Sequence, residues 1–470
     1  MTDDKRQAET RPSKTFFVSM LTRDIELQDA LLDLLDNCID GAVRTGATST
    51  DDMQPYQGYW AKLTLSPAGF RLADNCGGIP ISTARNRAFR LGRPPAAEDD
   101  AVDGKTVGVY GIGMKRAIFK LGRNATVTSN GDDPFQVRID PAWLNADDWQ
   151  PLELAAHNPD ADAVKGTIII VEELYDSVAK DLGSKDWIER FRRYVASHYA
   201  LIIGKGFEVS IDADNISTAP IRAAEFSLAV TGDLGGGGVQ PFIYKGEIGG
   251  VNVQIFAGLL RKPLNAAEIA EAEGEHSEKS AAGWTIACND RVVVSRDRTH
   301  LTGWGTGGLA SYHGQYSVIS GIVLLYADDV QKLPLTTTKR GLDGSSAVYA
   351  KVLDVMREAT KKLTAFTNAY KTDEDRRELL DDAPKRSLAE LRSFDDLRVV
   401  EKGGLQGFQV LTPDLPKPVN KARPPRVSFE VTRDELKVLR EFFEDEDRKD
   451  NEIGRAAFDF SLDSAGFQHR

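Results

Sequence analysis

Cysteine is scarce in this sequence, with three residues, Cys38, Cys76 and Cys288, among 470. No two of them have the CxxC spacing of a zinc-binding or dithiol redox motif, so neither kind of site is predicted. A chain this poor in cysteine is typical of a reducing compartment, where disulfides are rare. We therefore expect a cytoplasmic protein.

Long hydrophobic runs are also missing. The longest strongly apolar stretch, residues 318–327, covers half of the roughly 20 residues that a transmembrane helix needs. The first fourteen residues, MTDDKRQAETRPSK, are too polar for a signal peptide. The formal net charge of −12 excludes a globally basic nucleic-acid coat but leaves room for a local basic groove. Together these features predict a soluble protein with no membrane partner.

The length and composition favour a globular protein of several domains. A chain of 470 residues corresponds to two to four domains at about 150 residues each. The 41% hydrophobic content excludes wholesale disorder and fibrous repeats. Helical and strand patterns are interspersed rather than strictly alternating, which favours an α+β fold. We expect a flexible N-terminus over 1–14, an α+β domain over 15–225, a second over 226–370, a charged and Pro-rich linker over 371–426, and a small C-terminal segment over 427–470.

The first informative motif lies on an expected helix over residues 24–44. At 100° per residue, Asp33, Asp36, Asn37 and Asp40 share one stripe of this helix, whose other sides are apolar. A solvated acidic face is the ordinary interpretation of such a stripe. Two features favour a site instead: an asparagine among carboxylates suits magnesium, and so apolar a helix should be buried, with its polar stripe lining a cavity.

The second motif, DNCGGIP, starts at Asp74 and follows an expected strand over 69–74. Its residues are those of an ordinary turn. They would equally suit an aspartate that accepts a hydrogen bond from the exocyclic amine of a nucleobase, with glycines that let the ring approach the backbone. Both interpretations stay open on this segment alone.

The third motif, GVYGIGMK, spans residues 108–115 and precedes an expected helix over 116–121. Glycines before a helix can present backbone N–H groups to phosphate oxygens, or can simply turn the chain. A neighbouring Gly104-Lys105-Thr106 resembles the end of a P-loop, but Asp99 stands where the first glycine of that motif belongs. We therefore reject the P-loop.

In this order, the motifs resemble the ATP-binding domain of the GHKL superfamily, which includes type II topoisomerases, MutL proteins, the large heat-shock chaperones, MORC proteins and histidine kinases. The resemblance implies a Bergerat α/β sandwich that binds ATP and Mg²⁺. It assigns Asp33 as the general base, Asn37 as the magnesium ligand and Asp74 as the adenine-reading residue, with Gly166-Thr167 closing the pocket. The other nucleotide contacts implied are Asp40, Gly78, Ile79, Gly108, Gly111, Ile112, Gly113, Met114, Lys115 and Thr167.

Two residues depart from the family pattern. Cys76 replaces the first glycine of the second motif, although Gly77 and Gly78 follow it. Asp33 stands where ATP-hydrolysing members usually have glutamate, and its shorter side chain withdraws the carboxylate from the roughly 2.6–3.2 Å reach that general-base catalysis requires. Glu26 cannot substitute, because seven residues along a helix span about 10 Å. We expect slow but real turnover.

A second resemblance lies further along the chain. The segment LPLTTTK, residues 333–339, resembles the loop that carries the switch lysine in the transducer domain of gyrase and MutL, an S5-like α+β fold. This implies that Lys339 contacts the γ-phosphate, where an ammonium would stabilise developing charge. The alternative is an ordinary surface lysine. A hairpin over 283–293 would belong to the same domain, and its polar turn is open to a purely structural interpretation.

These resemblances lead to a functional hypothesis. We expect an ATP-operated clamp that most resembles bacterial MORC-like or MutL-like proteins. Its lid, residues 81–107, would close on Mg-ATP. The N-terminal domains of two copies would then form a homodimer. The client would be DNA, in repair, chromosome organisation or phage defence, or else a protein. The alternative is a nucleotide-gated interaction module with little or no hydrolysis. One basic cluster stays open as phosphate or DNA contacts: Lys115, Arg116, Lys120 and Arg123. A second stays open as nucleic-acid contacts or a solvated helix face: Arg190, Arg192 and Arg193.

Overall fold

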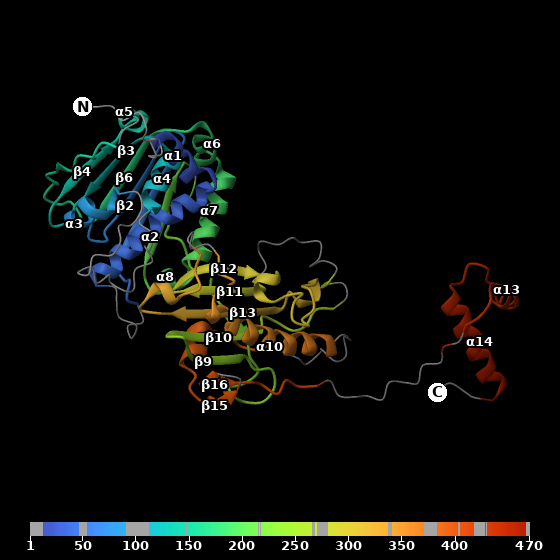
Figure 1. Cartoon of the computed structure of the whole chain (residues 1–470). Coiled ribbons are helices and arrows are strands. Elements are labelled where there is room, and N and C mark those ends of the chain that lie inside the picture. The colour runs from blue at the N-terminus through green and yellow to red at the C-terminus, as the bar shows by residue number, and fades with distance from the viewer. Residues whose placement is uncertain are drawn as a thin grey trace, which may run out of the picture. The chain divides into compact units, whose positions relative to one another are not determined.

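The computed structural model describes residues 13–46, 54–90, 112–146, 149–214, 216, 218–265, 268–269, 281–336, 341–370, 383–402, 405–417, 428 and 430–466. It divides into two compact units, Met1–Pro418 and Val419–Arg470. The first unit contains two β-sheets with separate hydrophobic cores, and helices cover both sheets (Figure 1). The protein is therefore an α+β protein, as the mixed sequence pattern predicted.

The first sheet has seven strands in the order β5-β4-β3-β6-β2-β1-β7. Strands β1 and β7 run parallel, and the other neighbours are antiparallel. The strand expected over 69–74 is confirmed as β2, which pairs with β1 in an antiparallel hairpin. The strands are β1 (Trp60–Ser66), β2 (Gly69–Asp74), β3 (Gly122–Ser129), β4 (Phe135–Ile139), β5 (Ala155–Ala156), β6 (Thr167–Leu174) and β7 (Glu208–Ala213).

Helices pack against this sheet, and the longest of them is the predicted motif helix α2. Its leucines, together with Cys38 and Ile39, are buried, which agrees with the expectation that so apolar a helix lies inside the domain. The helices are α1 (Lys14–Arg23), α2 (Leu27–Thr45), α3 (Ile81–Thr83), the π-helical turn η1 (Ala84–Ala88), α4 (Gly113–Leu121), α5 (Pro141–Asn145), α6 (Asp176–Leu182), α7 (Lys185–His198) and α8 (Ala200–Gly204).

Helix α1 lies just before α2 and was not predicted. Its first residue, Lys14, is fully buried. The Lys14 ammonium donates a hydrogen bond to the carbonyl of Trp143 (2.6 Å) and lies 4.0 Å from the centre of that indole ring. These contacts hold α1 against α5, and the anchoring depends on a residue 129 positions away in the chain.

The second sheet follows the order β12-β11-β13-β10-β9-β16-β15, with β8 pairing both β10 and β14. Residues 385–411, expected to lie in a charged linker, instead supply β14, α12, β15 and β16, so this part of the prediction is corrected. The elements are β8 (Ser227–Ala229), β9 (Phe242–Ile248), β10 (Val251–Leu259), β11 (Gly283–Cys288), β12 (Arg291–Asp297), η2 (His300–Thr302), η3 (Gly314–Tyr316), β13 (Ile319–Tyr326), η4 (Val330–Lys332), α10 (Ala347–Ala369), β14 (Lys385–Ser387), α12 (Leu388–Ser393), β15 (Arg398–Lys402) and β16 (Leu405–Leu411).

Both faces of the second sheet are covered. Ile255 and Ala257 of β10 belong to the core that includes α10, whereas Phe256 between them belongs to the core on the other face with Leu391 of α12. This alternation follows from the two-residue period of a strand. Leu201 of α8 packs against the same face as Phe256, so the first domain contributes to covering the second sheet.

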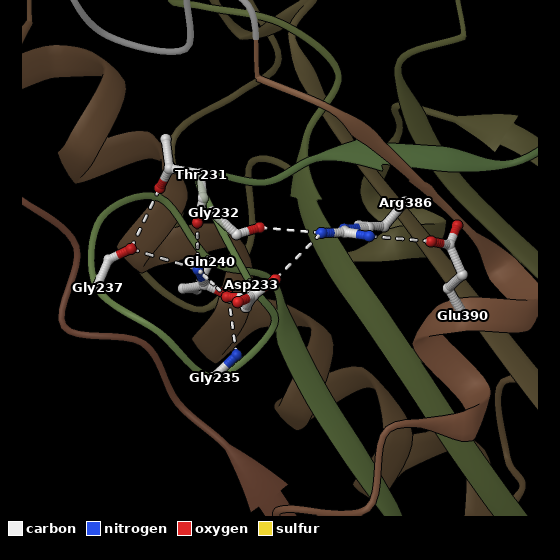
Figure 2. A network of polar contacts seen from close by, with 8 residues as sticks. All are labelled: Thr231, Gly232, Asp233, Gly235, Gly237, Gln240, Arg386 and Glu390. Carbon is white, nitrogen blue, oxygen red and sulfur yellow. Dashed lines mark hydrogen bonds and ion pairs between the residues drawn. The ribbon is translucent and has the colours of Figure 1, made fainter.

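Four consecutive glycines, Gly235–Gly238, lie in the loop between β8 and β9 (Figure 2). The loop folds around the buried amide of Gln240, whose Nε2 donates hydrogen bonds to the carbonyls of Thr231 (2.9 Å) and Asp233 (3.0 Å). Arg386 of β14 forms an ion pair with Asp233 (3.8 Å). Gln240 thus holds the residues around the glycines in place, and the Arg386–Asp233 ion pair connects the loop to the sheet.

The second unit is a pair of helices, α13 (Arg433–Phe442) and α14 (Asp450–Ser464). A capping box between Thr432 and Glu435 begins α13. The rings of Phe442 and Phe460 lie 5.2 Å apart and join the two helices. Within the described part of the chain, no helix is both long and apolar enough to cross a membrane.

Candidate functional site

The first part of the candidate site is the carboxylate of Asp33, on the face of α2 that meets α4. Asp33 is 6% exposed, and its Oδ2 lies 2.5 Å from Nη2 and 3.2 Å from Nε of Arg116. At the start of α4, a Cβ added to Gly113 would lie 3.2 Å from the Cβ of Asp33. The structure therefore brings the acidic motif and the third glycine of the GxxGxG motif into contact.

Asn37 and Asp40 lie further along the same helix. Asn37 is exposed, whereas Asp40 is 6% exposed. Among the residues that the structure describes, no group of three or more His, Cys, Asp or Glu side chains could hold a metal ion. A nucleotide-bound magnesium needs one or two protein ligands besides phosphates and water, so a single exposed amide oxygen fits it.

Asp36 does not share the face of Asp33 and Asn37, which corrects the prediction of one stripe lining the site. In a helix, Asp36 is rotated by about 60° to one side of Asp33 and Asn37 by about 40° to the other. That rotation places the Asp36 carboxylate against Arg291 (2.8 Å) and Tyr199 (2.8 Å), both buried. Two carboxylates three positions apart in the sequence thus have different surroundings.

Asp74, at the end of β2, is fixed by backbone groups. Its Oδ1 accepts hydrogen bonds from the N–H groups of Cys76 (2.8 Å) and Thr167 (3.1 Å). A Cβ added to Gly166 would lie 1.8 Å from the Asp74 carbonyl oxygen, so only glycine fits at this position. Burial raises the pKa of Asp74, although these hydrogen bonds oppose the shift. The Gly-Thr and Asp motifs, about ninety residues apart, therefore form one structure.

The glycines after Asp74 form a tight turn. Gly77 and Gly78 have φ values of 86° and 75°, which favour glycine. A Cβ added to Gly78 would lie 2.9 Å from Oγ of Ser129, whose hydroxyl also accepts a hydrogen bond from the N–H of Ile79 (2.9 Å). Arg44 of α2 donates to the Gly78 carbonyl (2.9 Å). The motif thus forms a turn, as one of the two interpretations predicted. This turn is also compatible with a binding role.

Cys76, the departure from the family pattern, is buried in that turn. Burial raises the pKa of its thiol, which is therefore neutral at physiological pH. A Cβ added to Gly41 of α2 would lie 2.8 Å from the Cys76 carbonyl oxygen. The turn and α2 therefore approach through a glycine on the helix, and the Cys76 side chain occupies the interior.

Lys115 follows Ile112, Gly113 and Met114 at the start of α4 and is 2% exposed. Its ammonium donates hydrogen bonds to the carbonyl oxygens of Arg87 (3.5 Å) and Arg90. Burial lowers its pKa to about 8. The third motif is therefore joined to residues 81–90, the start of the expected lid.

Several predicted site residues lie outside the described part of the chain. They are Gly108 and Gly111 of the third motif, Lys339, and residues 91–107 of the expected lid. The described members of the basic cluster near α4 contact the protein itself: Lys120 donates to the carbonyl of Thr22 (3.1 Å), and the Arg123 guanidinium lies 5.2 Å from the Tyr175 ring.

Sequence reasoning missed the partners of the two α2 carboxylates. Arg116 was considered only as a phosphate or DNA contact, and Arg291 only as part of a polar hairpin turn. Gly113 and Arg116 are three residues apart, a spacing that places both on one side of α4. This spacing was the one sequence feature that could have indicated that Arg116 lies near the acidic motif. No local signal pointed to Arg291.

Comparison with known families agrees with this geometry. Residues 25–148 match the family model described as "Histidine kinase-, DNA gyrase B-, and HSP90-like ATPase". The matched segment contains Asp33, Asn37, Asp74 and Gly113 and ends before Gly166. The chain has no match among curated proteins. Residues 25–148 therefore form an ATP-binding domain of the GHKL superfamily.

Proposed function

We propose that this protein is an ATPase that binds Mg-ATP in its N-terminal domain, hydrolyses it slowly, and uses the bound nucleotide to bring two copies of the chain together around a DNA or protein client. The observation that carries the proposal is the convergence of motifs from distant parts of the sequence. Asp33 meets Gly113, and Asp74 meets Gly166-Thr167. The family match supports ATP binding by this domain.

Adenine recognition is assigned to Asp74. Two backbone N–H groups hold its Oδ1, which sets the direction of the carboxyl group and leaves Oδ2 for the exocyclic amine of the base. Gly78 carries no side chain, and Ile79 follows it beside Ser129, so the base would pack against backbone and an apolar side chain. Thr167 closes the same end of the site.

Phosphate binding is assigned to the glycines at residues 108–113 and to the start of α4, with Lys115 as the cationic contact. The free N–H groups of the first turn of a helix favour anions. Lys115 contacts the carbonyl oxygens of residues 87 and 90, so phosphates would compete with these carbonyls for its ammonium. Exchange of these partners would couple nucleotide binding to movement of residues 81–90.

Hydrolysis is assigned to Asp33, which would take a proton from the attacking water. The Arg116 guanidinium lies 2.5 Å from its carboxylate and would fix the direction of the side chain. Asn37 would hold Mg²⁺, which supplies charge neutralisation at the β- and γ-phosphate oxygens when it is bound. From the transducer-like loop, Lys339 would contact the γ-phosphate and report the triphosphate state to the second domain.

Steady-state phosphate release tests the enzyme assignment. We expect D33A to lose turnover by at least about 100-fold, the lower range for a general base, while binding a fluorescent ATP analogue as the parent does. E26A is the matched control, since Glu26 is an exposed carboxylate at the N-cap of α2, about two turns from Asp33, with no capping hydrogen bond. Unchanged turnover in D33A would rule out Asp33 as the base.

The Asp33–Arg116 ion pair favours one alternative. A base that is both shorter than glutamate and bound to an arginine would suit a nucleotide-gated interaction module that binds ATP with little hydrolysis. No phosphate release above background from the parent, with ATP binding retained, would support this alternative over the enzyme.

Dimerisation and the client need separate measurements. Sizing of the protein with and without a non-hydrolysable ATP analogue should show dimers in the parent and fewer in K339A. Retention of DNA by the ATP-bound form should fall steeply with salt if phosphate contacts carry the binding. No retention at low salt would leave the protein client as the proposal.

A further inference from the structure

A buried ion pair joins α2 to the second sheet. The Arg291 Nε lies 2.8 Å from Oδ1 of Asp36, and the two side chains are 2% and 3% exposed. The hydroxyl of Tyr199, also buried, lies 2.8 Å from the same carboxylate oxygen and 2.9 Å from the carbonyl oxygen of Leu32. The proposed ATP chemistry uses none of these groups, although Asp36 stands between Asp33 and Asn37 in the sequence.

The position of Arg291 is set by the second domain. Arg291 begins β12 directly after the two-residue turn of the β11–β12 hairpin, where Asn289 and Asp290 have φ values of 45° and 66°. These angles are those of a type I′ turn, which suits the twist of a hairpin. The Asn289 amide accepts from the N–H of Ala327 (3.1 Å) and donates to its carbonyl (3.0 Å). These hydrogen bonds hold the hairpin tip against the end of β13. The backbone at Arg291 is therefore fixed in position.

The pair acts on the helix that carries the proposed base. Asp36 follows Asp33 by less than one turn and directly precedes Asn37, so a rotation of α2 about its axis moves all three together. In a buried environment the attraction between two charges is several times stronger than at the surface, and the cost of separating them is correspondingly larger. Burial lowers the pKa of Arg291, but Asp36, Tyr199 and Asp33 together raise it by more, so the arginine stays charged.

We propose that Arg291 is a positioning residue: through its ion pair with Asp36, the second domain sets the orientation of α2 and hence the alignment of Asp33 and Asn37 with the nucleotide. This inference rests on the proposed function, because it deepens the role of α2 in that site. It makes the catalytic competence of the N-terminal domain depend on the β11–β12 hairpin.

The test uses the full-length chain with both charges removed. R291M alone would leave a buried carboxylate without its partner and would destabilise the protein. The double variant R291M/D36L replaces the pair by apolar residues, an exchange that is often neutral for stability. We expect it to unfold at nearly the parent's temperature, to keep a KM for ATP within about twofold, and to lose kcat by about tenfold or more, since small misplacements of catalytic groups are costly. A kcat equal to the parent's overturns the inference.

A neighbouring ion pair provides the matched control. Lys205, just after α8, lies 2.5 Å from Oδ2 of Asp290 and so joins the same hairpin to the N-terminal domain without contacting α2. The variant K205M/D290N removes this pair and keeps a residue at position 290 that tolerates positive φ. We expect its kcat to match the parent's. An equal loss in both double variants would show general loosening between the domains and overturn the role of Arg291.

Hydrogen exchange separates this inference from the proposed function. In the absence of nucleotide, amides of residues 31–41 should exchange at least about tenfold faster in R291M/D36L than in the parent, while those of β1 and β2 are unchanged. Equal exchange in α2 overturns the inference whatever the turnover. A parent that releases no phosphate contradicts the proposed function, and the exchange result still decides whether Arg291 orders α2.

Discussion

Helix α2 carries two aspartate–arginine pairs, three residues apart, in very different surroundings. On the nucleotide face, Asp33 and Arg116 are 6% and 18% exposed, and both belong to the N-terminal domain. On the neighbouring face, about 60° around the helix, Asp36 and Arg291 are 3% and 2% exposed and join two domains. A partly exposed pair can exchange its partner for water or phosphate at modest cost, whereas a buried pair cannot. We infer that the first is built to change partners and the second to stay closed.

The largest expected effect is that of breaking the buried pair from one side. R291M should lower the free energy of unfolding by about 3–5 kcal/mol, because it leaves the Asp36 carboxylate buried without its cation. Denaturant titration followed by circular dichroism measures this. A loss below about 1 kcal/mol would mean that Asp36 is as readily solvated as Asp33. That result would contradict the proposed difference between the two ion pairs.

A pH effect should come from the same buried face. His198, beside Arg291, has its pKa lowered by burial to about 4. Between pH 6.5 and 4 the unfolded chain binds this proton and the folded chain does not, so stability falls as the pH drops through that window. The parent should lose up to about 3 kcal/mol more than H198Q between these pH values. Parallel stability curves for the two proteins would contradict the burial of His198.

The nucleotide-side pair should matter less for stability. R116M should lower the free energy of unfolding by about 1–2 kcal/mol, because the pair it breaks is less buried, with Arg116 18% exposed. The informative measurement is the difference between R116M and R291M in the same titration. Equal losses would show that the two faces of α2 are energetically alike.

The smallest effect is expected at the exposed start of α2. Glu26 is the N-cap residue, and its side chain makes no capping hydrogen bond. E26A should therefore change the free energy of unfolding by less than about 0.5 kcal/mol. A larger loss would mean that charge at this end of α2 contributes to the behaviour assigned to the two pairs.

Local patterns predicted several elements correctly. The β1–β2 hairpin follows from two alternating strands around Ser66-Pro67-Ala68-Gly69, and α2 follows from its apolar periodicity. Helix α1 was missed because its anchor, Lys14, depends on Trp143. Residues 385–411 were taken for a linker because their strands are short and charged, and only pairing with β8 and β9 makes them part of a sheet.

The sequence by itself determined the motifs: the order of Asp33, Asn37, Asp74, Gly113 and Thr167 is enough to indicate a GHKL ATP-binding domain, because the nucleotide requires particular residue types at short, local spacings. The tertiary structure decided which carboxylate faces which arginine. Asp33 and Arg116 are 83 residues apart, and Asp36 pairs with a residue of another domain. Such contacts depend on the rotation of helices and on packing between elements that are far apart in the sequence. Neither can be inferred from composition or periodicity.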